Sequence, residues 1–195
     1  MRSIKEIMRS SAVLNSDGVH IGGSDRESNH SYGDAYERII TNNFSRGPAE
    51  PRDTVQLMME IGVADGSCLL AWREVFPNAT IVGMDIHHSD KAHGDRIEFH
   101  LGSQRSKEDC DHVAASRHFD MIVEDAAHHL DNSLLTLFYL WPHVRPGGLY
   151  VVEEFANVGA LRENIITLWP FAQIVNTVGP FGGVEPLVVL RKPVL

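Results

Sequence analysis

From residue 55 onward, short apolar runs alternate with turn-rich and helix-like segments. The apolar runs predict five strands, at residues 55–63, 80–86, 96–102, 119–125 and 149–155. The segments between them predict helices at residues 64–77, 132–144 and 160–170, and residues 172–179 and 185–193 predict a terminal antiparallel pair. Strands that alternate with helices indicate an α/β fold, a mostly parallel sheet with helices on both faces.

The part of the chain before residue 55 has a different pattern. Residues 1–14 are amphipathic and predict a surface helix, and a second helix is expected to start near Ala35. Residues 15–34 are rich in Gly, Ser, Asn and Asp, which is typical of a long loop or lid. Residues 45–53 form a breaker segment that leads into the core.

Composition narrows the function classes. With 43% hydrophobic residues, the 195-residue chain is long enough for one domain with a sizeable core. No apolar stretch approaches the roughly 20 residues that a membrane span needs, and the first residues lack the apolar core of a secretory signal. The net charge of −9 argues against binding of nucleic acid through phosphates and suits a small-molecule enzyme or a divalent cation. Two cysteines without metal spacing, Cys68 and Cys110, favour a cytoplasmic protein.

A glycine-rich turn follows the first predicted strand. Glu60, Gly62 and Gly66 are spaced as E-x-G-x-x-x-G, and glycines here let the backbone approach a ligand closely. The second glycine of a dinucleotide fingerprint is missing, so a nucleoside without phosphates fits better than a pyrophosphate. Asp85 ends the next strand, where an acid can hold ribose hydroxyls. The alternative is a glycine turn that only packs.

Charged residues gather at the predicted ends of two neighbouring strands. Asp125 and His128 follow the strand at 119–125, and Glu153 and Glu154 end the strand at 149–155. Carboxylates this close repel one another unless a cation compensates, and oxygen ligands select Mg²⁺, Ca²⁺ or Mn²⁺ over zinc. His128 is then the candidate general base, and His129 a spectator. The alternative is that Glu153 and Glu154 lie at the solvent-exposed start of a helix and bind nothing.

The motifs together resemble those of class I S-adenosylmethionine-dependent methyltransferases. The resemblance rests on "EIGVADGS", "GMDI", "GSQ", "FDMIVED" and "RPGGLYVVEE". It implies a Rossmann-like sandwich whose seven-stranded, mostly parallel sheet has a terminal antiparallel strand. It also implies that the glycine loop lies under the methionine part of the cofactor and that Asp85 binds the ribose. Ser103 and Gln104 correspond to a segment near the adenine, with Ser103 in place of the family's acid.

The pattern is similar to a narrower group, the metal-dependent mycinamicin-type macrolide sugar O-methyltransferases. Its aspartate, two small residues and histidine correspond to Asp125 through His128, and its Glu-Asp pair to Glu153 and Glu154. The resemblance implies that Asp125, Glu153 and Glu154 bind the metal and that Asp125 and His128 are catalytic. Residues 23–37 match an upstream segment of the group, which implies an active-site cover in which His30 and Tyr32 contact the substrate.

The expected function is Mg²⁺-dependent methyl transfer from S-adenosylmethionine to a hydroxyl of a sugar or polyhydroxylated natural product. A catechol-type O-methyltransferase and a non-catalytic cofactor-binding scaffold are the alternatives. We expect N-terminal helices and a lid in residues 1–50 and the cofactor-binding catalytic domain in residues 51–195. The expected partner is a small hydroxylated acceptor, not nucleic acid or a membrane, and a homo-oligomer stays open.

Aromatic residues and histidines outside these motifs have simpler interpretations. Trp72, Trp141 and Trp169 lie in apolar helical patterns and are predicted to be core residues. His87, His88 and His93 follow Asp85 and are interpreted as surface loop residues.

Overall fold

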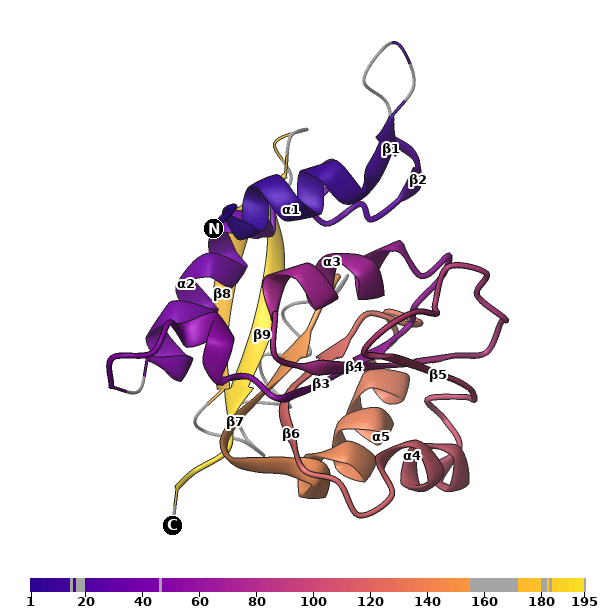
Figure 1. Ribbon diagram of the computed structural model, residues 1–195. Helices are drawn as coiled ribbons and strands as arrows, with labels where there is room; N and C mark the ends of the chain where they lie inside the picture. The colour runs from indigo at the N-terminus through magenta and orange to yellow at the C-terminus, as the bar shows by residue number, and fades with distance from the viewer. Residues whose placement is uncertain are drawn as a thin grey trace.

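The structure, a computed structural model, has helices packed on both faces of a central sheet (Figure 1). It describes residues 1–14, 16, 20–45, 47–154, 172–179, 182 and 184–194. The predicted helix at 160–170 and Trp169 lie outside the described residues. The described α-helices are α1 (Ile4–Ser11), α2 (Gly33–Phe44), α3 (Ser67–Val75), α4 (Lys107–Ala114) and α5 (Leu130–Leu140), and the 3₁₀ helices are η1 (Pro51–Thr54) and η2 (Trp141–His143).

Within the described residues, seven strands form the central sheet, in the order β5-β4-β3-β6-β7-β9-β8. They are β3 (Leu57–Ile61), β4 (Thr80–Asp85), β5 (Ile97–Leu101), β6 (Phe119–Glu124), β7 (Val144–Val152), β8 (Ala172–Val178) and β9 (Val184–Arg191). The first five strands in this order are parallel to one another, and β9 runs antiparallel to both of its neighbours. All seven strands predicted from the apolar runs are confirmed, as is the fold class.

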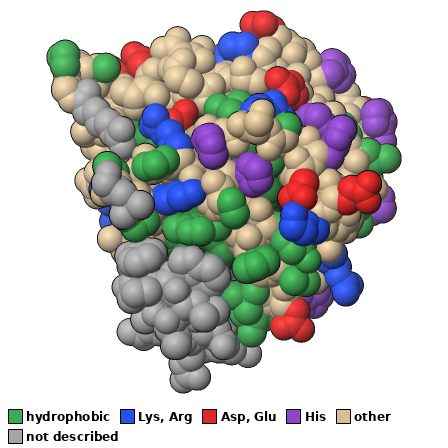
Figure 2. Space-filling model, turned by 90° about the horizontal axis from the view of Figure 1, so that it is seen from below, with side chains coloured by type: hydrophobic (Ala, Val, Ile, Leu, Met, Phe, Trp, Pro, Cys, Tyr) green, Lys and Arg blue, Asp and Glu red, His purple; other side chains and the backbone are tan. Residues whose placement is uncertain are grey.

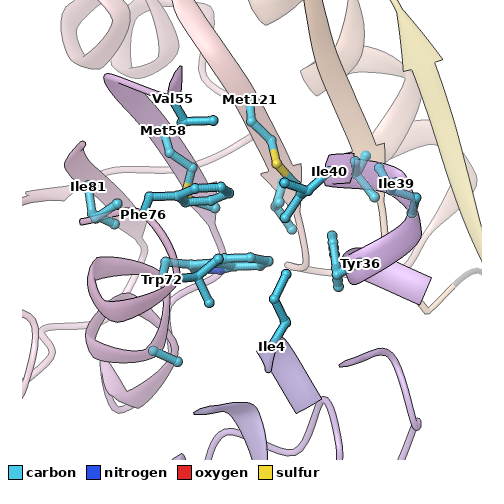
Figure 3. Close-up of a cluster of buried hydrophobic side chains, with 14 of the residues drawn as sticks. Ile4, Tyr36, Ile39, Ile40, Val55, Met58, Trp72, Phe76, Ile81 and Met121 are labelled. Atoms are coloured by element: carbon cyan, nitrogen blue, oxygen red, sulfur yellow. The ribbon is translucent and has the colours of Figure 1, made fainter. Parts of the chain in front are cut away.

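Successive side chains along each strand point to opposite faces of the sheet, so the core has two parts, one on each face. Met58 belongs to the cluster under α1, α2 and α3, and the next residue, Met59, belongs to the cluster under α4 and α5. Trp72 is fully buried at the centre of the first cluster, where it stacks on Phe76 and meets the edge of Tyr36 (Figure 3). Its prediction as a core residue is confirmed, whereas Trp141 is only partly buried against the second cluster.

The segment predicted as a loop at residues 15–34 contains more structure than its composition indicates. Strands β1 (Ala12–Leu14) and β2 (His20–Gly23) form an antiparallel hairpin after α1. Beyond the hairpin, Arg26 and Tyr32 are fully buried. The second half of this polar segment is therefore packed against the body of the protein. Helix α4, which the sequence analysis did not predict, is polar along most of its length.

Histidines also gather on the face that α4 and α5 cover, together with exposed hydrophobic side chains (Figure 2). Two histidine pairs lie on this side of the sheet, His100 with His112 and His118 with His143, at centroid distances of 6.0 and 6.5 Å. None of these four lines the cavity described below. In the part of the chain that the structure describes, helices of the length and apolarity needed to cross a membrane are absent.

Candidate functional site

A cavity of about 690 Å³ lies at the carboxyl ends of β3, β4 and β6. This is the edge at which open α/β sheets bind their ligands. The wall includes Gly62, Asp85, Gln104, Asp125, His128 and Glu154. The structure therefore brings together the glycine turn and the charged cluster, which lie in separate parts of the sequence.

The glycine turn between β3 and α3 is held by Asp85. One oxygen of the Asp85 carboxylate, Oδ2, accepts hydrogen bonds from the backbone N–H groups of Val63 (2.8 Å) and Ala64 (2.9 Å). The other, Oδ1, accepts one from His87 N–H at 2.8 Å. A carboxylate offers about four lone-pair sites, so Asp85 orders the turn and still has acceptor capacity toward the cavity.

Gly62 brings this turn into contact with the charged cluster. Its backbone is left-handed, with φ +86°, and a Cβ built there would lie 2.1 Å from the carbonyl oxygen of Asp125. The Asp125 N–H in turn donates to Ile61 O at 2.8 Å. A glycine is thus required here both for the conformation and for the close approach of two backbones.

Arg26 forms a buried ion cluster beneath the cavity. Its guanidinium, fully buried, donates to Glu60, to Glu153 Oε1 at 2.8 Å and to Asp125 Oδ2 at 2.8 Å. Tyr36 donates its hydroxyl hydrogen bond to the same Glu153 oxygen. Three carboxylates therefore share one guanidinium, an arrangement that leaves excess negative charge in a region with little water.

Burial and crowding of the carboxylates in this cluster raise the pKa values of two of its acids. Burial raises the pKa of Glu60 to about 7, with repulsion from Glu153 adding to the effect and Arg26 opposing it. Burial, followed by repulsion from Glu153, raises the pKa of Asp125 well above its usual range. Both shifts have the same origin, carboxylates held close together in a buried place.

A second, more open cluster contains Asp125, His128 and Glu154. Each offers one ligand atom, and the three atoms lie within 4.8 Å of one another. His128 Nε2 lies 3.5 Å from Glu154 Oε2 and 4.0 Å from Asp125 Oδ1. Nδ1 of His128 is buried and has no hydrogen-bond partner among the described residues. These donors suit a hard divalent cation with two carboxylate ligands.

The backbone is strained at two residues of this open cluster. His128 and Glu154 both have left-handed φ values of +50° although neither is glycine. Such conformations cost on the order of 1–3 kcal/mol each and persist where the surroundings over-determine them, commonly at functional sites. The two residues after β7 point in opposite directions: the side chain of Glu154 lines the cavity, and that of Glu153 points to Arg26.

Comparisons with known proteins agree with this geometry. No family model matches the chain. Mycinamicin VI 2''-O-methyltransferase of Micromonospora griseorubida is 36% identical over 59% of this chain, and demethylmacrocin O-methyltransferase of Streptomyces fradiae is 32% identical over the same share. The chain spans about 31% of the length of each of these relatives. The predicted resemblance to macrolide sugar O-methyltransferases is confirmed.

Among solved structures, the MycE methyltransferase of the mycinamycin pathway, in complex with Mg, SAH and mycinamycin VI, superposes with a TM-score of 0.68. The alignment covers 98% of this chain and 54% of that one, at 21% sequence identity. The chain has the methyltransferase fold. Within this fold, the cavity occupies the edge where the sequence analysis expected the cofactor and metal residues.

Several residues predicted for the methyltransferase site lie away from the cavity wall. Glu60, expected to bind cofactor, and Glu153, expected to bind the metal, are held inside by Arg26. Gly66, with φ +87°, begins α3 and packs closely against the backbone of Ala92. Side chains alternate between the two faces of a sheet. The positions of Glu60 and Glu153 direct both side chains to the face under α1, α2 and α3, away from the cavity.

The two residues predicted to contact substrate are also engaged within the protein. His30 bonds to Asp25, Glu154 and Glu185, with Nε2 at 2.8 Å from Glu154 Oε1. Burial opposes its charge, but these hydrogen bonds outweigh it and raise the pKa of His30 to about 11. Tyr32 is fully buried and stacks on the His30 ring. Both therefore help to build the wall behind Glu154.

The segment predicted near the adenine is part of the cavity. Ser103 and Gln104 both line it, and the Gln104 side chain donates to Glu124 at 2.9 Å and accepts from Ala127 N–H at 3.0 Å. These bonds fix the turn between Asp125 and His128. His129 is exposed at the start of α5, and His87, His88 and His93 are exposed as expected, although His87 reaches the cavity wall.

The close approach at Gly62 predicts a measurable difference between two glycine variants. Gly62→Ala should destabilise the protein by the left-handed strain, roughly 1–2 kcal/mol, plus roughly 1–3 kcal/mol for the contact with Asp125. Gly47→Ala is the matched control, since Gly47 has φ +74° and open space around its Cβ position. The free energies of unfolding in urea separate the two effects: Gly47→Ala measures the backbone strain alone, and Gly62→Ala measures the strain together with the contact. Equal losses of stability would contradict the role given to the Gly62 contact.

Proposed function

We propose that the protein is an S-adenosylmethionine-dependent, Mg²⁺-dependent O-methyltransferase that acts on a hydroxyl of a sugar or polyhydroxylated natural product. One observation carries the proposal: the cluster of Asp125, His128 and Glu154 opens into the same cavity as the glycine turn and Asp85. A methyl donor and a metal-bound hydroxyl need to meet in such a place. The sequence similarity to sugar O-methyltransferases supports the acceptor class.

The cofactor half of the proposal rests on the turn after β3. Gly62 and the following N–H groups form one side of the cavity, and Asp85 stands at the end of β4 with an oxygen available for ribose hydroxyls. Gly102, Ser103 and Gln104 provide the wall on which the adenine would lie. A cavity of this size is typical of small-molecule sites.

The metal half rests on charge and donor chemistry. Asp125 and Glu154 would hold Mg²⁺ through Asp125 Oδ1 and Glu154 Oε2, the two carboxylate oxygens that face each other across His128 Nε2. Bound there, Mg²⁺ would lower the pKa of an acceptor hydroxyl. Glu153 remains with Arg26 and contributes negative charge from beneath. The two free cysteines are consistent with the cytoplasmic location that we also propose.

His128 is proposed as the general base. It lines the cavity, with Nε2 at 3.5 Å from Glu154 Oε2 and 4.0 Å from Asp125 Oδ1, so it would lie beside an acceptor hydroxyl held at these carboxylates. His129, exposed at the start of α5, does not line the cavity. The geometry therefore favours His128 over its neighbour.

The cofactor assignment is tested by removing the Asp85 carboxylate. Each lost hydrogen bond from a charged group costs about 1.5–3 kcal/mol, so Asp85→Ala should weaken binding of S-adenosylhomocysteine roughly 10- to 100-fold in calorimetry. Asp65→Ala is the control, because Asp65 lines the same cavity but pairs with Lys91. A folded Asp85→Ala variant with wild-type affinity would argue against ribose binding at Asp85.

The reaction itself is tested by a methyl-transfer screen over glycosides and catechols with S-adenosylmethionine. We expect methylated glycosides, with turnover abolished by EDTA and restored by Mg²⁺, because the carboxylates need the ion to activate the acceptor. Methylation of catechols alone would replace the sugar class by the catechol class. Binding of S-adenosylmethionine without methylation of either class would indicate the non-catalytic scaffold, and full turnover in EDTA would rule out the metal's role.

The base assignment is tested by paired histidine variants. His128→Ala should lower the turnover rate roughly 10²- to 10⁴-fold, the usual contribution of a positioned base, while Mn²⁺ and S-adenosylhomocysteine still bind. His129→Ala should turn over at close to the wild-type rate. If His129→Ala shows the larger loss, the turn after β6 presents the other imidazole to the acceptor.

A further inference from the structure

Arg26 is the one described residue that pairs with all three of Glu60, Asp125 and Glu153, at the ends of β3, β6 and β7. The sequence analysis did not assign it a role, since it lies in a polar segment far from those strands. Its side chain is fully buried, and it also lies over the ring of Trp72, with 5.5 Å between the guanidinium carbon and the ring centroid. It is therefore fixed on several sides.

The Asp125 carboxylate is divided between the buried cluster and the open one. Oδ2 accepts a hydrogen bond from Arg26 at 2.8 Å, and Oδ1 faces His128 Nε2 at 4.0 Å. A carboxylate is free to turn about its last torsion, which has a broad and shallow preference. The bond from Arg26 removes this freedom and leaves Oδ1 directed at the cavity.

Glu154 is held in a matching way by the next turn of the same segment. His30 Nε2 contacts Glu154 Oε1 at 2.8 Å, and Oε2 faces His128 Nε2 at 3.5 Å. Both candidate ligands thus have one oxygen bound by a side chain of residues 25–30 and the other directed at the open cluster. Repetition of the pattern in two carboxylates indicates that this segment shapes the cluster.

We infer that Arg26 is a positioning residue, which orients Asp125 so that Oδ1 can bind a divalent cation. The inference rests on the proposed function, because it requires a cation at Asp125 and Glu154. Partners that orient metal ligands typically change metal affinity 10- to 100-fold when they are removed. Arg26 does not touch substrate, cofactor or reacting atoms in this assignment.

Charge and orientation predict opposite effects of removing Arg26. The guanidinium repels a nearby cation, so charge alone would make a variant without it bind Mn²⁺ more tightly. Loss of orientation would make the same variant bind more weakly. The sign of the change in affinity therefore decides between a residue that only neutralises buried acids and one that positions Asp125.

Direct binding of Mn²⁺ to the full chain, followed by electron paramagnetic resonance, measures this sign without turnover. Arg26→Gln should bind Mn²⁺ roughly 10- to 100-fold more weakly than the wild type. Affinity for S-adenosylhomocysteine, whose proposed site lies across the cavity, should change by less than about threefold. Tyr36→Phe is the matched control, because it removes a hydrogen bond to Glu153 from the same buried cluster and leaves Asp125 untouched; its Mn²⁺ affinity should stay within about twofold.

Unchanged or tighter Mn²⁺ binding by Arg26→Gln would overturn the inference, as would an equal loss in Tyr36→Phe. If Arg26→Gln does not fold, Arg26→Lys is the test. Its compact ammonium keeps the charge but lacks the planar fork that spans several carboxylates, so the affinity for Mn²⁺ should fall by at least about threefold, and wild-type affinity would overturn the inference.

A wild type that binds S-adenosylhomocysteine but no Mn²⁺ would overturn both the metal assignment of the proposed function and this inference. If the wild type binds Mn²⁺ and the variant binds it equally well, only this inference is overturned.

Discussion

The contact on which the site depends is the buried guanidinium of Arg26 among three carboxylates. Charges without water are costly unless they are paired, and breaking one partner of such a pair typically costs about 3–5 kcal/mol. The carboxylates at the ends of β3, β6 and β7 are therefore compensated only where the segment around Arg26 is docked against them. The segment around Arg26, whose sequence is typical of a loop, therefore supports the charged residues at the edge of the cavity.

The same cluster explains why neighbouring acids differ in what they do. Glu60 and Glu153 lie on strand positions that face the helical layer of α1, α2 and α3, where Arg26 meets them. Glu154 follows directly and points to the other side, into the cavity, and Asp125 lies at the boundary with one oxygen on each side. Negative charge that one guanidinium does not balance is thereby placed directly under a site with carboxylate and imidazole donors. This distribution favours a divalent cation at the open end.

Much of the architecture could be predicted because most of the parallel strands (β3, β4, β6 and the second half of β7) are apolar runs that are buried on both faces. Asp85, Asp125 and His128 could be placed for the same reason, since residues just past such strands lie at one edge of the sheet. Arg26 could not be found this way, because an arginine in a polar segment is ordinarily exposed and its partners are far apart in the sequence. Helix α4 has few apolar positions, and the one local signal for it was Ser106, whose side chain caps its first turn. Opposite directions for Glu153 and Glu154 follow from the alternation of side chains along a strand, but the pattern does not show that Arg26 holds Glu153.

Arg26 is far in the sequence from the residues that it contacts, and this affects when the contacts can form during translation. Arg26 is 34 residues from Glu60, 99 from Asp125 and 127 from Glu153. A chain made from its N-terminus at about 5–20 residues per second exposes the guanidinium for several seconds before its last partner leaves the ribosome. During that interval the ion cluster lacks at least one of its three carboxylates. The complete ion cluster can therefore form only after Glu153 has been made, and a nascent chain halted before β7 could pair Arg26 with Glu60 and Asp125 alone.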